Sequence, residues 1–516
     1  MNTDLVLALY AAAVAGLAVF GLHRLCLLLL YARVRRSVPP VAAVVDDEAA
    51  PRVTVQLPLY NERYVATRLV LATARLDHPR DRLHVQVLDD STDDTTARLE
   101  RLIRRLRRLG YRIEHLRRPR RTGFKAGALE YGLQRTDADY VAVFDADFVP
   151  APDFLRRTLP HFADPRVGMV QSRWGHLNRE RSLLTRLQAV FLDGHFHVEH
   201  VARNRTGRFF NFNGTAGVWR RRAIVEAGGW EHDTLTEDLD LSYRAQMRGW
   251  HFVYLDDVIS PAELPEDMNA FKAQQHRWAK GSAQTALKLL GRVLRADLPL
   301  AVKVEAFLHL TSNFTYVLMT GPILLWVPTL AAGVADDDPR MLLLAATMSL
   351  TTTCVLAYYL TGQHAAGRRL RSSVAELPAL LALGIGMSVN NARAVVEALA
   401  GHDSPFLRTP KSGGHDGSGV GSSFDRFAYR LRARWHTWLE LVLAGYFVFG
   451  LVVAVQAGKW VALPFLLLFL FGFLYVGLGS LGRRTDGLLR VGSAVVGVAM
   501  LGAVLWVSRE VLTRWP

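Results

Sequence analysis

The sequence predicts an α/β domain with a doubly wound, mostly parallel sheet, joined to an all-α membrane region. Between residues 51 and 300 the chain is polar and charged, and short apolar runs alternate with helical patterns. The first thirty residues and the part after about residue 300 are instead apolar, with runs long enough to span a bilayer. A domain exposed to water therefore lies between membrane segments.

The composition narrows the classes of function. The chain has 516 residues, of which 50% are hydrophobic, and a formal net charge of +15 that comes mostly from arginine. In a membrane protein, basic residues mark cytoplasmic loops and contacts with lipid headgroups, so we do not expect a nucleic-acid partner. Cys26 and Cys354 both lie inside apolar runs, which indicates neither a disulfide framework nor a zinc site.

The first apolar run, residues 5–31, is long enough for a transmembrane helix. Arg33, Arg35 and Arg36 follow it, whereas a secretory signal carries its basic residues ahead of a shorter apolar core. Because basic residues concentrate on the cytoplasmic side, we expect the amino terminus outside and the next domain in the cytoplasm. We assign residues 1–33 to this helix and the Pro/Ala/acidic residues 34–50 to a linker.

The run at residues 140–148, YVAVFDADF, indicates a buried strand that stops at two carboxylates, Asp145 and Asp147. The carboxyl ends of strands are where α/β sheets bind ligands. Hard oxygen ligands of this kind suit Mg²⁺ or Mn²⁺, with a diphosphate as a further ligand. A solvated turn that caps the next helix is the alternative.

Strands predicted for residues 53–57 and 84–88 also end in polar residues. Parallel strands end at one edge of a sheet, so we expect these residues in the same region as the two aspartates. The polar residues after the two strands include Tyr60, Glu62, Asp89 and Asp90.

Three later segments carry chemistry-bearing residues. In residues 121–129, two glycines and Lys125 at a helix start are suited to phosphate; an ordinary loop with a surface lysine is the alternative. The loop 209–217, FFNFNGTAG, is suited to sugar faces, or is an ordinary turn. The helix predicted for residues 187–201 carries His195, His197, Glu199 and His200. His197 and His200 are three residues apart, but His195 faces away from them, so we favour a packed or surface helix over a metal site.

Four elements in series resemble the processive branch of the family 2 glycosyltransferases, which includes cellulose, hyaluronan and chitin synthases. They are DDSTDD at 89–94, DAD at 145–147, TED at 236–238 and QQHRW at 274–278. Segments such as FNGTAGVWR and EAGGW are most similar to the mannan and glucomannan synthases. The resemblance is dense over residues 53–281 and returns at FLRTPK, residues 406–411.

The resemblance implies a site for a nucleotide diphosphate sugar, with Asp145 and Asp147 as ligands of Mg²⁺ or Mn²⁺ and Asp238 as catalytic base. The positions implied for donor binding are Tyr60, Glu62, Asp89, Asp90, Lys125, Asp145 and Arg277. The positions implied for acceptor binding are Gln274, Trp278, Glu237, Asn213 and Gly214. The loop implied to close over the nucleotide contributes Phe406, Arg408, Thr409 and Lys411, although a plain cytoplasmic linker remains the alternative.

The chemistry of sugar transfer agrees with these roles. The leaving diphosphate gathers negative charge, which a divalent cation, Arg277 and Lys125 would stabilise. The attacking hydroxyl must lose its proton, and one positioned carboxylate, Asp238, suffices as base. Because one displacement inverts the anomeric centre, an α-linked donor would give a β-linkage.

Charges between the apolar runs of the membrane region, residues 301–516, determine which runs we expect to cross. Arginine-rich segments near 368–371, 408–434 and 483–490 should lie inside, which is consistent only if residues 377–389 do not cross. We therefore expect an interfacial helix near 377–400, a cytoplasmic loop near 401–436 and six spans in the plasma (inner) membrane. The apolar runs are 307–334, 341–360, 377–389, 439–455, 461–481 and 491–507.

Together these features predict an inverting, metal-dependent hexosyltransferase with its catalytic domain, residues 51–300, in the cytoplasm. It would polymerise a β-linked glucan or mannan from UDP-glucose or GDP-mannose and export the chain between its spans. The alternative enzyme transfers one sugar to a lipid acceptor such as diacylglycerol or ceramide. A catalytically inactive membrane scaffold is a third interpretation, which the complete set of expected acids disfavours.

Overall fold

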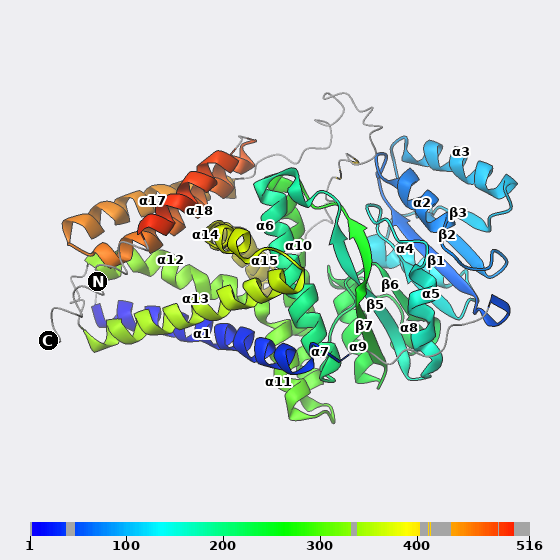
Figure 1. Ribbon diagram of the computed structural model, residues 1–516, viewed down its shortest axis with the longest axis horizontal. Helices are drawn as coiled ribbons and strands as arrows, with labels where there is room; N and C mark the ends of the chain where they lie inside the picture. Colours follow the sequence, from blue (N-terminus) through cyan, green and yellow to red (C-terminus); the bar gives the residue numbers. More distant parts are fainter. Residues whose placement is uncertain are drawn as a thin grey trace.

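The computed structural model describes residues 3–37, 47–331, 338–402, 411, 413, 435–482 and 485–499. A sheet with its covering helices forms one end of the molecule, and long apolar helices form the other (Figure 1). The loop residues Phe406, Arg408 and Thr409 lie outside the described residues, whereas Lys411 is described.

The sheet has seven strands in the order β3-β2-β1-β4-β6-β5-β7. β1 pairs in parallel with β2 and β4, and β2 with β3, whereas β6 is antiparallel to both β4 and β5. The predicted mostly parallel sheet is therefore confirmed, and the antiparallel strand β6 was not among the predicted strands. The strands are β1 Val53–Leu59, β2 Leu83–Asp89, β3 Ile113–Leu116, β4 Tyr140–Val143, β5 Val167–His176, β6 Gly217–Arg220 and β7 His251–Ala262.

Helices cover both faces of the sheet, and each face has its own apolar core. One core contains Leu69 of α2 (Ala66–Ala74) and Leu99 of α3 (Thr95–Arg108), and α5 (Phe154–Thr158) also contributes. The other contains Leu129 of α4 (Phe124–Leu133) and Leu241 of α9 (Glu237–Met247), with α8 (Arg221–Glu226). Burial on both faces explains why the central strands are continuous apolar runs rather than alternating ones.

The segment after β5 is not the regular helix expected for residues 187–201. α6 (Leu183–Gly194) passes into a π-helical turn, His195–His200, and then into α7 (Val201–Arg205). The wider π turn brings residues five apart onto one side, so the His195 and His200 ring centroids lie 4.2 Å apart. The expectation that His195 faces away from the other histidines was wrong for this reason.

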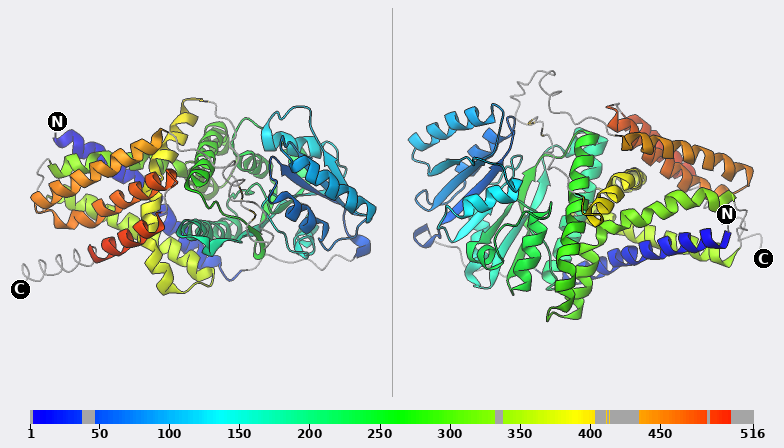
Figure 2. Two further views of the ribbon diagram at one scale, coloured as in Figure 1. Left: turned by 90° about the horizontal axis from the view of Figure 1, so that it is seen from above. Right: turned by 180° about the vertical axis from the view of Figure 1, so that it is seen from behind.

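Two helices connect the sheet to the membrane region. α10 (Met268–Arg295) begins at Asp267, whose carboxylate accepts hydrogen bonds from the backbone N–H groups of Asn269 and Ala270. α10 stands between the sheet and the membrane helices in both side views (Figures 1 and 2). α11 (Leu300–Leu310) follows it.

Six helices among the described residues are long and apolar enough to cross a membrane, as a multi-pass membrane protein requires. One of them, Leu370–Leu399, covers the segment expected to lie along the interface, and Figures 1 and 2 show it running across the direction of the others. The interfacial placement stays a prediction, and the predicted span over 491–507 lies partly outside the described residues. The helices are α1 Thr3–Val34, α12 Thr315–Ala331, α13 Pro339–Ala365, α14 Leu370–Gly386, α15 Ser388–Leu399, α17 His436–Gln456 and α18 Leu463–Ser480.

Candidate active site

A pocket at the carboxyl edge of the sheet, bordered by α9 and α10, brings together most of the residues expected from the sequence. Carboxylates from segments far apart in the chain converge there with cationic and aromatic side chains. The expected residues that line it are Tyr60, Glu62, Asp90, Lys125, Asp145, Asp147, Asn213, Gly214, Glu237, Asp238, Gln274, Arg277, Trp278 and Lys411.

One end of the pocket has a carboxylate and an aromatic ring, each held by an arginine. Asp90 accepts hydrogen bonds from Arg118 Nε at 3.1 Å and Nη2 at 2.5 Å. The Arg121 guanidinium lies 3.5 Å from the centroid of the Tyr60 ring. Both arginines are in the loop before α4 and were not among the residues expected from the sequence. The only sequence feature that could have indicated these two arginines was a basic run next to a glycine-containing helix start.

Asp89, which was expected beside Asp90, does not line the pocket. Its side chain is buried and accepts a hydrogen bond from Thr96 Oγ1 at 2.8 Å, and its carboxylate lies 3.0 Å from His115 Nε2. Burial alone would raise the pKa of Asp89, but hydrogen bonds from His115, Ser91 and Thr96 lower it to about 2. Asp89 therefore fixes the turn that presents Asp90.

The two aspartates after β4 each face an ammonium group. Lys125 Nζ lies 2.6 Å from Asp145 Oδ1, and Lys411 Nζ donates to Asp147 Oδ2 at 2.7 Å. The backbone N–H of Asp145 is fixed by Thr215 Oγ1 at 2.8 Å. Carboxylate oxygens are the hard ligands that a divalent cation such as Mg²⁺ or Mn²⁺ prefers.

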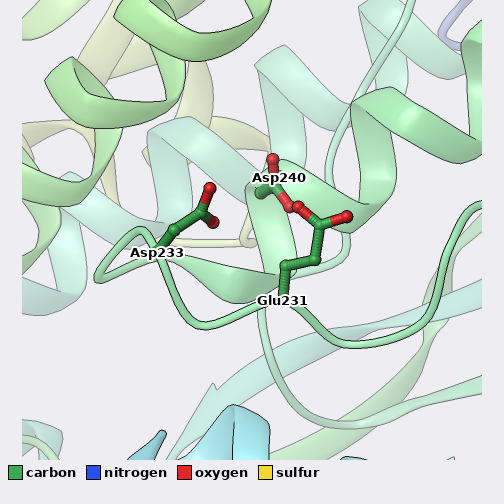
Figure 3. Close-up of side chains that lie close together, drawn as sticks. All are labelled: Glu231, Asp233 and Asp240. Atoms are coloured by element: carbon green, nitrogen blue, oxygen red, sulfur yellow. The ribbon is translucent and has the colours of Figure 1, made fainter.

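A second acidic group, made of Glu231, Asp233 and Asp240, also lies close enough together to hold a cation (Figure 3). Lys288 already occupies that position. Its Nζ lies 2.5 Å from Glu231, 2.7 Å from Asp233 and 3.0 Å from Asp240. This cluster is therefore an ion-pair network that joins α9 and the loop before it to α10. Asp145 and Asp147 differ from it in lining the pocket.

Glu237 and Asp238 begin α9 and face the interior of the pocket. Burial and the neighbouring Glu237 carboxylate raise the pKa of Asp238 to about 7, a value suited to a general base. Burial alone would lower the pKa of Lys125, but Asp145 and Glu237 raise it above its usual value, so Lys125 stays cationic.

Gly214 makes this arrangement possible. Its backbone is in the left-handed region, with φ 79°, and its carbonyl accepts from Lys125 Nζ at 2.8 Å. A Cβ atom at this position would lie 2.8 Å from Asp238 Oδ2. The position therefore requires glycine both for its backbone conformation and for the space beside the carboxylate.

Aromatic rings line the side of the pocket next to α10. Trp278 of α10 and Trp174 near the end of β5 have ring centroids 6.5 Å apart. Phe148 and Phe196 pack against Trp174 at centroid distances of 5.3 Å and 5.2 Å. Trp174 was not expected in the site, although its position at the end of a strand was the available signal.

Residues 51–281 match the family model of the glycosyltransferase-like proteins of family 2. The probable glucomannan 4-beta-mannosyltransferase 9 of Oryza sativa subsp. japonica is 46% identical over 269 residues, which cover 49% of this chain and 51% of that protein. Glucomannan 4-beta-mannosyltransferase 7 of Arabidopsis thaliana is 34% identical over 453 residues, 84% of this chain and 77% of that protein. The chain belongs to this family, together with the glucomannan 4-beta-mannosyltransferases.

The matches differ in extent. The aligned part spans about half the length of several of these relatives, such as 49% of glucomannan 4-beta-mannosyltransferase 2 of Arabidopsis thaliana. Among solved structures, a mannosyltransferase from Pyrobaculum calidifontis in complex with GDP-Man and Mn²⁺ superimposes with a TM-score of 0.54. It is 21% identical and covers 77% of this chain and all of its own, so this likeness supports the fold alone.

Proposed function

We propose that this protein transfers mannosyl residues from GDP-mannose to the 4-position of a growing β-linked mannan or glucomannan, with inversion at the anomeric carbon. Relatives named glucomannan 4-beta-mannosyltransferase, at 46% identity over the catalytic region, support the sugar and the linkage. The solved mannosyltransferase with GDP-Man and Mn²⁺ shares the fold. These comparisons favour GDP-mannose over UDP-glucose, the other donor expected from the sequence.

One observation carries the proposal: a carboxylate with a raised pKa lies beside cationic groups in a pocket that also holds aromatic rings. Asp238 is close to Lys125, and Trp278 borders the same space. A base for the acceptor, charge stabilisation for the leaving group and a platform for a sugar ring are the three requirements of direct glycosyl transfer.

Each residue has a role that follows from its position. Asp238 takes the proton of the acceptor hydroxyl as that oxygen bonds to the anomeric carbon and the bond to the diphosphate oxygen breaks. Lys125 and Arg277 stabilise the negative charge that the diphosphate gains. Asp145 and Asp147 would hold a divalent cation, which supplies further charge neutralisation to the diphosphate. Trp278 offers its face to the acceptor sugar.

The membrane helices support synthesis coupled to export. One helix would anchor a catalytic domain, yet six helices of sufficient length and apolarity are present in the described part of the chain. With the pocket on the cytoplasmic side, a chain elongated beside Trp278 would leave between the helices that α10 contacts. The basic segments between the apolar runs support this orientation.

The test uses the full chain in lipid nanodiscs with GDP-mannose, GDP-glucose or UDP-glucose, each with Mn²⁺. We expect polymer from GDP-mannose that an endo-β-1,4-mannanase degrades, and none from an Asp238→Asn variant. A single-sugar lipid product, detected by mass spectrometry, would establish the glycolipid alternative. Wild-type protein without product from any of these donors would contradict the proposal.

A further inference from the structure

The π-helical turn carries a group of buried charged and polar side chains that the proposed chemistry does not use. Glu199, Arg203 and His200 are 6%, 2% and 0% exposed. They lie between the membrane helices and the loop of Asn213 and Gly214 in the pocket. Buried charges are costly unless paired, so their partners indicate what the group does.

Glu199 is the centre of this group and binds side chains from both membrane helices next to it. Arg24 of α1 forms an ion pair with Glu199, and the Tyr358 hydroxyl of α13 donates to Glu199 Oε1 at 3.0 Å. Arg203 Nη1 donates to Glu199 Oε2 at 3.2 Å. The Arg24 guanidinium also lies 4.7 Å from the centroid of the Tyr358 ring.

A second contact fixes α1 at the same level. His23 of α1 lies 3.0 Å from Glu305 Oε1 of α11, and the same oxygen accepts from Arg203 Nε at 2.8 Å. Two consecutive residues of the first membrane helix thus bind two buried carboxylates that share Arg203. Such contacts fix the axial position and rotation of α1, which apolar packing alone does not do as precisely.

From Glu199 the contacts continue into the pocket. His195 Nδ1 lies 2.9 Å from Glu199 Oε2, and its Nε2 accepts from Asn213 Nδ2 at 3.0 Å. His200 Nε2 donates to Asn213 Oδ1 at 2.6 Å. Burial lowers the pKa of both histidines, that of His200 to about 3, so both are neutral and each offers one donor and one acceptor.

Asn213 is therefore held on both sides of its amide, and its backbone N–H donates to Gln171 Oε1 at 3.0 Å. The next residue, Gly214, is the one whose carbonyl binds Lys125 and where an added Cβ would meet Asp238. A shift of Asn213 would move Gly214 with it. A single side chain, that of His195, connects Glu199 to the pocket residue Asn213.

We propose that Glu199 and His195 position the Asn213–Gly214 loop for catalysis, and that membrane helices α1 and α13 take part in this positioning through Arg24 and Tyr358. The two helices are then parts of the catalytic apparatus as well as membrane anchors. The inference rests on the proposed function for its kinetic readout only. Replacing a buried ion network by apolar residues often leaves the stability of a protein unchanged or raises it. Attachment of α1 and α13 to the domain therefore does not by itself require the ion network around Glu199.

The test compares Tyr358→Phe with Tyr446→Phe in the full chain in nanodiscs. Each change removes one phenol hydroxyl from a membrane helix, but the Tyr446 hydroxyl donates to the Leu324 carbonyl at 2.8 Å, away from the pocket. Glu199→Gln is the stronger variant, since it keeps the shape of the side chain and removes its charge. Thermal unfolding checks that all three variants are folded.

We expect both Tyr358→Phe and Glu199→Gln to lower kcat, and Glu199→Gln to lower it about tenfold. This loss is smaller than the roughly hundredfold loss of rate expected when a reacting group is misplaced by about an ångström. Donor affinity should stay at the wild-type value, because the nucleotide end of the pocket lies at Tyr60 and Asp90. Tyr446→Phe should leave kcat unchanged. Equal effects of the two tyrosine variants, or a loss of donor affinity that accounts for the loss of rate, would overturn the inference.

Hydrogen–deuterium exchange of the peptide 209–217 gives a readout that does not need activity. We expect faster exchange in Glu199→Gln and Tyr358→Phe than in the wild type, and no change in Tyr446→Phe. If the wild type transfers no sugar, the proposed function fails while this comparison still decides the positioning. Unchanged exchange in Glu199→Gln would refute the positioning even in an active enzyme.

Discussion

The acid limb of the pH–rate profile is the most direct measure of how Glu237 changes the pKa of Asp238 at the start of α9. In the proposed mechanism Asp238 acts as a base, which requires its ionised form, and burial together with the Glu237 charge raises its pKa from 3.8 to about 7. Since its ionised fraction grows with pH, the rate of transfer at pH 6 should be about a tenth of the rate at pH 8. We expect kcat to level off above this range.

Glu237→Gln provides the perturbation. The substitution removes the negative charge that raises the pKa of Asp238, so the acid limb should move to lower pH, by on the order of one unit. The maximal kcat of this variant is expected to fall because Glu237 also lines the pocket. The pH at which the rate reaches half of its maximum does not depend on how large that maximum is. The assay is radiolabelled mannose incorporation from GDP-mannose at saturating donor, from pH 5 to pH 9.

Glu231→Gln is the matched control. Glu231 has the same charge and lies close to the start of α9, but its carboxylate binds Lys288 outside the pocket. Its removal should leave the acid limb where the wild type has it. The reasoning would be refuted if the limb stayed in place or moved to higher pH in Glu237→Gln.

Three further predictions concern other parts of the pocket. Asp90→Asn should weaken binding of the donor nucleotide about tenfold in a calorimetric titration, because the charged acceptor for Arg118 is lost; unchanged affinity would place the nucleoside elsewhere. Asp147→Asn should abolish stimulation by Mn²⁺, whereas Glu231→Gln should retain it, and the reverse result would move the metal to the Lys288 cluster. Gly214→Ala should lower kcat at least tenfold while the protein stays folded, because the new Cβ meets the Asp238 carboxylate, the proposed base; wild-type activity would contradict this arrangement.

The sequence determined the parts of this protein that depend on local pattern. Continuous apolar strands followed by acids located the carboxyl edge of the sheet, and Asp145 and Asp147 are at that edge. Helix and strand periods are properties of neighbouring residues, so β1, β2 and the first membrane helix, α1, were predicted within a few residues. The order of the four acidic and aromatic motifs was enough to indicate the family, which the comparisons confirm.

Tertiary structure decided which side chains actually meet. Asp89 and Asp90 are neighbours, and successive side chains at a strand end point to opposite sides, so only Asp90 lines the pocket. Strand β6 pairs antiparallel between β4 and β5, a partnership that no local pattern encodes. The π turn brings both His195 and His200 to the Asn213 side chain, although a regular helix would separate the two histidines. The pairing of β6 and the contacts of the two histidines join residues far apart in the chain, which is why local sequence patterns did not reveal them.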